Sequence, residues 1–344
     1  MKEERLRELL GRFGSLRIAV VGDLFLDKWF FINRNLDEPS VETGLMAYQV
    51  TRTQVSAGAA GTILNNLAAL GIGTCLAVGF VGLDGDGWEV LHALQKRGVD
   101  TRYVLQSEAV RTPAYMKPMF LQPAGPAVES NRLDVKNLEA TPKELEEELL
   151  KNIRKAAKEA DALIVLDQLD KEGTGVVTPN VRRELSKLAR ENPSLIVYAD
   201  SRAFIHTFRD VIIKCNNLEA ARMALGKASD AFSMDDVAAA MKVLKAQTGK
   251  DVFITCNQHG VAAHAGGRTF LVPAARQSGE IDVCGAGDAC TAGIVSALCA
   301  GADNREAAFL GNLTAGVTVR KIGTTGTASC EEVNALYREQ FGEE

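Results

Sequence analysis

Short apolar runs that end in Gly or Asp constrain the fold of this chain more than any other feature. One run covers residues 16–23, and two more, 161–167 and 195–200, flank a helical pattern over 181–190. Apolar runs of this length are typical of strands buried on both faces of a parallel sheet. When such strands alternate with helices, the helices cover both faces of the sheet. The sequence therefore predicts an α/β protein with three layers, α/β/α, and a mostly parallel central sheet.

Composition narrows the classes of function. The chain has 344 residues, 24% of them charged, and a net charge of -5, so it lacks the positive field that favours nucleic acids. No apolar run approaches the roughly 20 residues of a membrane span. The seven cysteines are scattered without a Cys-x-x-Cys pair, which favours reduced thiols. We expect a cytoplasmic protein that acts on a small molecule and has no nucleic-acid or membrane partner.

The strongest chemical signal lies in residues 281–289, Ile-Asp-Val-Cys-Gly-Ala-Gly-Asp-Ala, which precede an apolar helical pattern. Gly285, Ala286 and Gly287 are small enough for the backbone to approach a ligand closely. Their N–H groups would lie at a helix N-terminus, which favours an anion. Asp288, in the same turn, could take a proton from a hydroxyl that attacks a bound phosphoryl group. The alternative interpretation is a tight turn in which Asp288 caps the helix.

The longer string Asp282-x-x-Gly-Ala-Gly-Asp288 resembles the C-terminal signature of the ribokinase/PfkB family of sugar kinases. The resemblance implies a ribokinase-like fold, ATP and Mg²⁺ as cofactors, Asp288 as general base and a Gly-Ala-Gly anion hole. It extends over residues 18–333, and the order of motifs is most similar to the kinase domain of heptose-7-phosphate kinase/ADP-heptose synthases. We therefore expect transfer of the γ-phosphoryl group of ATP to a sugar or sugar phosphate.

Two segments that interrupt the alternation resemble the β-strand lid of this family. Residues 29–33 and 46–55 are rich in aromatic and β-branched side chains, as strands are. We expect lid segments at about 28–55 and 112–133 on a single ribokinase-like kinase domain, residues 1–344. Exposed apolar strands need a cover, so we also expect a homodimer formed through the lid.

The first part of the chain holds residues that the resemblance assigns to the substrate. The family has a substrate-binding Asp five residues after the first-strand Gly, which corresponds to Asp27, while Asp23 follows that Gly directly. The N-terminal signature is matched at Gly58. However, Ala59 replaces its second Gly, and Thr62 replaces an Asn that usually faces the substrate. Asp23 and Asp27 also suit the alternative role of turn or helix caps.

Lys117 and Arg132 lie in the second lid segment. They are candidates for binding an acidic substrate group such as a phosphate. The alternative is that both side chains are simply solvated, as basic residues near loops usually are.

Two motifs indicate where the nucleotide would bind. Asn216-x-x-Glu219 resembles the family motif linked to phosphate and Mg²⁺, an ion that is often held through water. The same spacing fits a capping box at the start of a helix. Thr255 and Gly260 match the family loop beside the nucleotide, although Asn257 replaces its first Gly.

Two further positions follow from the resemblance. Asn312 begins a helical stretch that borders the adenine in the family. Asp282 and the turn over residues 322–328 correspond to a monovalent-cation site, but Cys284 stands where a hydroxyl residue is usual.

Two other functions also fit these residues. One is a kinase of the same fold that phosphorylates a nucleoside or another small alcohol. The other is a non-catalytic regulator that binds a sugar or nucleotide. The altered positions Ala59, Thr62 and Asn257 favour the regulator, and the intact string from Asp282 to Asp288 favours a kinase.

Overall fold

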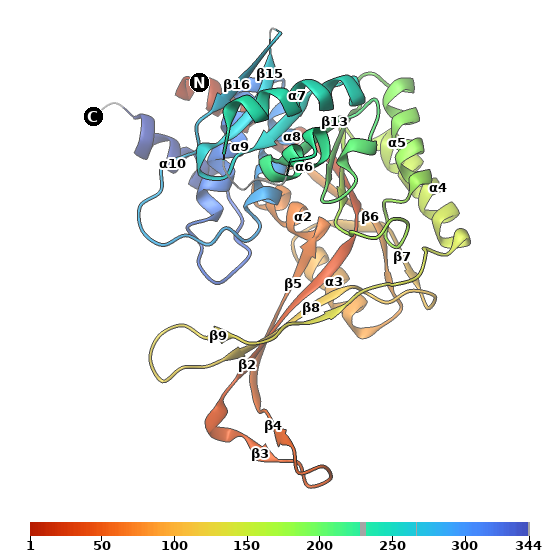
Figure 1. The fold of residues 1–344 in the computed structure, drawn as a ribbon, viewed down its shortest axis with the longest axis vertical. Coiled ribbons are helices and arrows are strands. Elements are labelled where there is room, and N and C mark those ends of the chain that lie inside the picture. Colours follow the sequence, from red (N-terminus) through yellow and green to blue (C-terminus); the bar gives the residue numbers. More distant parts are fainter. Residues whose placement is uncertain (228–231, 266, 343–344) are drawn as a thin grey trace.

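The computed structural model describes residues 1–227, 232–265 and 267–342, and Figure 1 shows a layered body from which a narrow sheet extends. Within these ranges the central sheet has nine strands in the order β16-β15-β14-β13-β12-β11-β1-β6-β7. Neighbouring strands from β7 to β14 are parallel, and β15 and β16 add an antiparallel edge. The strands are β1 (Arg17–Gly22), β6 (Thr74–Gly82), β7 (Asp100–Ser107), β11 (Ala162–Asp167), β12 (Ile196–Ser201), β13 (Ile212–Asn216), β14 (Val252–Thr255), β15 (Val261–Ala265) and β16 (Arg268–Val272). The predicted three-layer, mostly parallel fold is confirmed.

Helices cover both faces of this sheet because successive residues of each buried strand point to opposite sides. In β1, Ile18 and Val20 face one hydrophobic cluster, while Ala19 and Val21 face the other. The first cluster is covered by α1 (Glu3–Gly11), α2 (Ala60–Ala69), α3 (Gly85–Lys96), α8 (Ala286–Cys299), α9 (Asn304–Thr318) and α10 (Cys330–Phe341). The second is covered by α4 (Lys143–Glu159), α5 (Pro179–Glu191), α6 (Asn217–Leu225) and α7 (Met234–Thr248). Across the described ranges, no helix is both long and apolar enough to cross a bilayer.

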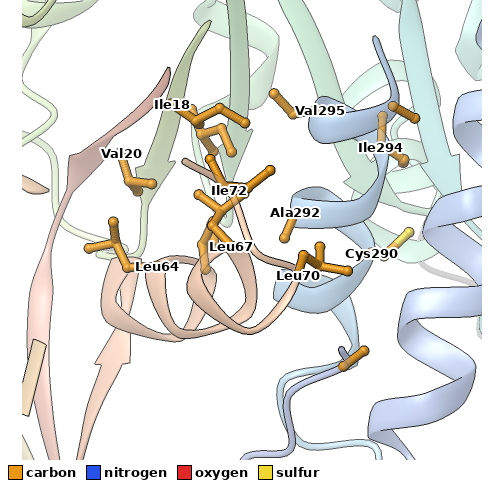
Figure 2. Close-up of a cluster of buried hydrophobic side chains, with 14 of the residues drawn as sticks. Ile18, Val20, Leu64, Leu67, Leu70, Ile72, Cys290, Ala292, Ile294 and Val295 are labelled. Atoms are coloured by element: carbon orange, nitrogen blue, oxygen red, sulfur yellow. The ribbon is translucent and has the colours of Figure 1, made fainter. Parts of the chain in front are cut away.

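The packing of α2 against α8 matters most for the site. Figure 2 shows Leu64 of α2 near Val20 of β1, and Leu67 of α2 near Ala292 of α8. These side chains are essentially inaccessible to solvent, so their burial contributes about 1.5–3 kcal/mol for each large residue. This contact fixes the N-terminus of α8 relative to the strand ends.

A second sheet, the lid sheet, extends away from the body (Figure 1). Its strands follow the order β10-β8-β2-β5, with β9 paired to β8. They are β2 (Leu24–Ile32), β5 (Val50–Ala59), β8 (Ala114–Phe120), β9 (Val128–Glu129) and β10 (Leu133–Val135), and a short hairpin of β3 (Glu38–Pro39) and β4 (Met46–Ala47) lies at the far end. Since β2 follows β1 after the single residue Asp23, the lid sheet continues directly from an interior strand of the main sheet.

The start of α2 contains a strained backbone position. Ala59 immediately precedes the helix with φ 52° and ψ -118°, a conformation that only glycine adopts readily. This geometry explains why a second glycine suits the signature at this point. Ala59 retains the conformation because the buried α2 and the end of β5 hold it from both sides.

We predict that Ala59→Gly raises the free energy of unfolding by about 1 kcal/mol, since it relieves this strain. Urea unfolding of both proteins measures the difference. Ala60→Gly, one residue farther and inside the helix, is the matched control and should lower the free energy by about 1 kcal/mol. Destabilisation by both substitutions would contradict the strain at Ala59.

Candidate active site

The N-terminus of α8 forms a small backbone cradle. Gly285 caps the helix with φ 78°, in the left-handed region that favours glycine. A Cβ at Gly285 would lie 2.7 Å from Cγ2 of Thr325 and 3.3 Å from Cγ2 of Thr62. Only glycine therefore fits, and Thr62 lies directly against the cradle, although its residue type departs from the family signature.

Two amides of this cradle are available to an anion. Ala286 donates its N–H to the carbonyl of Val283 at 3.1 Å, within the turn. In the described part of the chain the N–H groups of Gly287 and Asp288 have no acceptor. Free amides at a helix N-terminus combine with the helix dipole to attract negative charge.

A buried ion pair lies beneath the cradle. Lys214 of β13 donates to Asp200 of β12 at 2.6 Å, and both residues are at most 9% exposed. Thr291 of α8 adds a longer hydrogen bond to the same carboxylate oxygen, at 3.4 Å. A Cβ on Gly287 would be 3.3 Å from Nζ of Lys214, so the ammonium group lies against the first turn of α8.

Asp288 is half-buried in that first turn. Burial raises its pKa to about 7, and the negative charge of Asp200 acts in the same direction, while Lys214 opposes both. Burial alone would lower the pKa of Lys214, but the charges of Asp200 and Asp288 outweigh it and keep the pKa above its usual value. A carboxylate with a pKa near neutrality, beside a fixed cation, is suited to accept a proton.

The lid sheet brings a second charged pair toward this turn. Asp27 of β2 is 3.2 Å from Nζ of Lys117 of β8, and both side chains are nearly buried. The ammonium group also lies 4.4 Å from the centre of the Trp29 ring. Gly58 of β5 makes room for Asp27, because a Cβ there would be 2.4 Å from its Oδ2.

The two pairs lie close to each other. The negative charge of Asp27 contributes to the raised pKa of Asp288 after burial and Asp200. Burial raises the pKa of Cys284 in the turn before α8, and the charges of Lys117 and Asp27 act on the same thiol. The base of the lid sheet therefore faces the cradle.

Asp23 and Arg132 lie in different surroundings. Asp23 is buried, and its two oxygens accept hydrogen bonds from the backbone N–H groups of Gln168 and Val176. These bonds reach a loop far along the chain, so Asp23 caps neither a helix nor a turn of its own segment. Arg132 is exposed, pairs with Asp134 at 2.6 Å and stacks 4.0 Å from the centre of the Tyr115 ring.

Asn216 and Glu219 form a complete capping box at the start of α6. Glu219 N–H donates to Oδ1 of Asn216, and Asn216 N–H donates to Oε2 of Glu219, both at 2.8 Å. Burial and the charge of Asp200 raise the pKa of Glu219. The capping interpretation is thus realised, while Oε1 of Glu219 remains an oxygen ligand that could hold a hydrated cation.

The backbone conformation of the loop after β14 accounts for the departure from the family pattern at Asn257. Asn257 has φ 49°, and Asn tolerates this left-handed conformation better than most residues. Gly260 has φ 109°, and a Cβ there would be 2.0 Å from the Val272 carbonyl. Thr255 ends β14, with its hydroxyl 3.5 Å from the Cys215 carbonyl.

Asp282 and Asn312 hold neighbouring loops together. Asp282 accepts hydrogen bonds from the N–H groups of Cys284 and Gly323, each at 3.0 Å, and so joins the turn before α8 to the loop after α9. Asn312 donates to the Val272 carbonyl at 2.9 Å. In the described ranges no group of three or more His, Cys, Asp or Glu side chains is arranged to bind a metal ion.

Comparison with known proteins now decides the family. The model of the pfkB family carbohydrate kinases matches residues 16–330. The chain belongs to the PfkB family. It is therefore a phosphotransferase whose acceptor is a sugar hydroxyl.

The individual proteins that resemble this PfkB kinase share low sequence identity with it. It is 27% identical over 342 residues to the bifunctional protein HldE of Trichlorobacter lovleyi, covering 98% of this chain and 66% of that protein. Arabidopsis thaliana ribokinase complexed with ribose and ATP has a TM-score of 0.67 and 19% identity, covering 93% of this chain and 98% of that one. Phosphofructokinase-2 from Escherichia coli has a TM-score of 0.70 and 15% identity, covering 94% and 99%. The chain spans about two thirds of the length of the curated relatives.

Sequence reasoning missed Lys214 as a site residue of this PfkB kinase. The signal was present, because Lys214 interrupts the apolar run Val-Ile-Ile-Lys-Cys and lysine is almost never buried without a partner. The partner, Asp200, comes from the neighbouring parallel strand, with which Lys214 is in direct register.

We predict that Asp288→Asn stabilises the protein at pH 8. The pKa of Asp288 is about 7 in the folded protein and about 4 in the unfolded chain. A group with a raised folded pKa contributes its full stabilisation below pH 4. It loses this contribution as the pH rises through 7. The substitution removes the buried charge, so the free energy of unfolding should increase by about 1–2 kcal/mol at pH 8 and hardly change at pH 4.

Urea unfolding at both pH values measures this difference. Asp84→Asn is the control, for which we expect the opposite change in the free energy of unfolding. Burial alone would raise the pKa of Asp84, but hydrogen bonds from Thr112 and Gly87 outweigh it and hold the pKa below its usual range. Asp84→Asn should therefore destabilise the protein at pH 8. A stability loss from Asp288→Asn at pH 8 would contradict the proposed environment of Asp288.

Proposed function

We propose that this PfkB kinase transfers the γ-phosphoryl group of ATP to a hydroxyl of a sugar phosphate of the heptose-7-phosphate type, with Asp288 as general base. The observation that supports this proposal most strongly is the half-buried Asp288 at the start of α8. Its pKa is raised to about 7, and it lies beside the free amides and Lys214. A base and an anion cradle on one helix turn, with a cation against that turn, are the elements that phosphoryl transfer needs.

Each residue has a defined part in the step. Asp27 accepts a hydrogen bond from the sugar and orients the reacting hydroxyl. Asp288 takes the hydroxyl proton as the oxygen attacks the γ-phosphorus. A new P–O bond forms to the sugar, the bond to the β-phosphate oxygen breaks, and ADP leaves with that electron pair. The N–H groups of Gly287 and Asp288, with Lys214, balance the charge on the transferred group.

The residues present also fit ATP and Mg²⁺. Mg²⁺, when bound, neutralises the charge of the phosphates. Glu219 is half-buried and has a free oxygen, and Asn216 fixes its orientation through the capping box, which supports a magnesium ion held through water. Thr255, Gly260 and Asn312 are proposed to border the nucleotide, since they line neighbouring strand and helix ends. Cys284 weakens the case for a monovalent cation at Asp282.

The lid supports a substrate that already carries a negative group. Lys117 uses one donor toward Asp27 and is almost buried, so its other donors are available only to a ligand under the lid sheet. An ammonium group held in this way favours an anion over a neutral sugar. Arg132 lies farther out and is proposed as a supporting contact.

We also propose a homodimer formed through the lid. Large apolar side chains are exposed at its far end, among them Val41, Leu45, Met46, Tyr48 and Val50. Exposed apolar groups on a narrow sheet favour association with a second copy. Sedimentation velocity distinguishes a dimer from a monomer directly.

The decisive experiment measures ADP formation with Mg²⁺ and ATP across neutral sugars, sugar phosphates including heptose 7-phosphate, and nucleosides. We expect turnover on a sugar phosphate, reduced by roughly 10²-fold or more in Asp288→Asn because the general base is lost. Asp84→Asn, which alters a carboxylate at the start of α3 outside the site, should retain turnover.

Other outcomes identify other functions. Turnover only on a nucleoside or a neutral sugar would contradict the proposed substrate class. Binding of ATP without turnover on any acceptor would indicate the regulator instead, and Thr62→Asn would then be the first reversion to test.

A further inference from the structure

Asp23 occupies the junction between the body and the lid sheet. It is the single residue between β1 of the main sheet and β2 of the lid sheet, and it is 3% exposed. Its carbonyl accepts a hydrogen bond from the N–H of Ala60 at 3.0 Å, where β5 of the lid sheet passes into α2. The backbone of Asp23 therefore ties two lid strands to the body.

The side chain of Asp23 reaches a third segment, the loop over residues 168–176. Oδ1 accepts from the N–H of Val176 at 2.8 Å, and Oδ2 accepts from the N–H of Gln168 at 3.2 Å. One carboxylate thus holds both ends of the loop. Charge-assisted bonds from two amides to one carboxylate are stronger than neutral hydrogen bonds.

This loop in turn holds the chain that leaves the lid. Thr141, after β10, donates its hydroxyl to the Gly175 carbonyl at 2.7 Å and its N–H to the Gly173 carbonyl at 2.8 Å. Lys171 donates to the Leu138 carbonyl. Hydrogen bonds therefore connect Asp23 through the loop to the segment that follows the last strand of the lid sheet.

The contact is closely fitted. A Cβ at Gly175 would lie 2.4 Å from Oδ1 of Asp23 and 2.7 Å from Cδ1 of Leu169. Gly175 has an ordinary backbone conformation, because it is not among the residues with positive φ. The glycine is therefore needed for space alone, to admit the Asp23 carboxylate.

We propose that Asp23 is a positioning residue for the phosphoryl transfer, which sets the angle of the lid sheet so that Asp27 faces Asp288. This inference rests on the proposed function. Asp27 lies four residues along the strand, roughly 13 Å from Asp23. A tilt of about 5° at that junction would displace Asp27 by about 1 Å, and a misplacement of that size can reduce a rate by about 10²-fold.

The test compares Asp23→Asn with Asp303→Asn. The Asn amide nitrogen cannot accept, so Asp23→Asn loses one of its two bonds to the loop. Asp303 is the control for the substitution itself: it also accepts from two backbone amides, those of Arg305 and Glu306, but both bond to Oδ1, which Asn retains. It caps α9 near the end of α8 that is remote from Asp288.

Two readouts separate positioning from a merely structural role. In Asp23→Asn we expect kcat/KM for the acceptor to fall by about 10-fold or more, with KM for ATP within about 2-fold of the wild type. We also expect roughly 10-fold faster hydrogen exchange in β2 and β5, without a similar change in the main sheet. Asp303→Asn should show neither effect.

Unchanged exchange in the lid strands would overturn the proposal, and so would faster exchange with unchanged acceptor kinetics. Exchange needs no substrate, so it tests the junction even if no acceptor is turned over and the proposed function fails. If Asp23→Asn does not fold, Thr141→Val removes the hydroxyl bond to Gly175 and should change both readouts in the same direction. Wild-type values in Thr141→Val would then overturn the proposal.

Discussion

The ion pair of Lys214 and Asp200 sits where the central sheet meets the first turn of α8, and the rest of the site depends on it. Asp200 lies near two other carboxyl groups, Asp288 and Glu219, and burial, together with the negative charge of Asp200, raises the pKa of both. Without a buried cation their repulsion would favour protonation or separation. Removing one partner of such a pair typically costs about 3–5 kcal/mol. Lys214 therefore supports both the fold of this region and the charge balance that phosphoryl transfer needs.

The architecture places the two halves of the chemistry on different sheets. The main sheet and α8 supply the proposed anion cradle, cation and base, all at the carboxyl ends of parallel strands, where α/β folds usually bind ligands. The lid sheet supplies Asp27 and Lys117. Since the lid sheet continues from β1 through one residue, the register of these halves depends on local contacts at that junction. In the proposed mechanism, binding of the acceptor and activation of its hydroxyl are thereby linked.

The sequence predicted those features that are encoded locally. Apolar runs identified the parallel sheet, and the small-residue string identified the start of α8 because both patterns lie within a few consecutive residues. Lys214 was missed since its partner lies on another strand. The contacts of Asp23 were beyond prediction because they join residues 145 and 153 positions apart. Asn216 and Glu219 could be interpreted in two ways, since a spacing of three suits both a capping box and a cation ligand.

The most direct test of this account is the pH dependence of kcat/KM for the wild type and for Asp200→Asn on the acceptor that is turned over. If Asp288 is the base, kcat/KM of the wild type falls as the pH decreases below about 7, because the protonated carboxyl cannot accept the hydroxyl proton. Asp200→Asn removes a negative charge and leaves the positive charge of Lys214 uncompensated. Both changes favour the ionised form of Asp288, so the decrease in kcat/KM should move to lower pH. A profile that is flat between pH 5.5 and 8.5 in the wild type (a range of about 1.5 units on each side of 7), or a fall that Asp200→Asn does not move, would contradict the account.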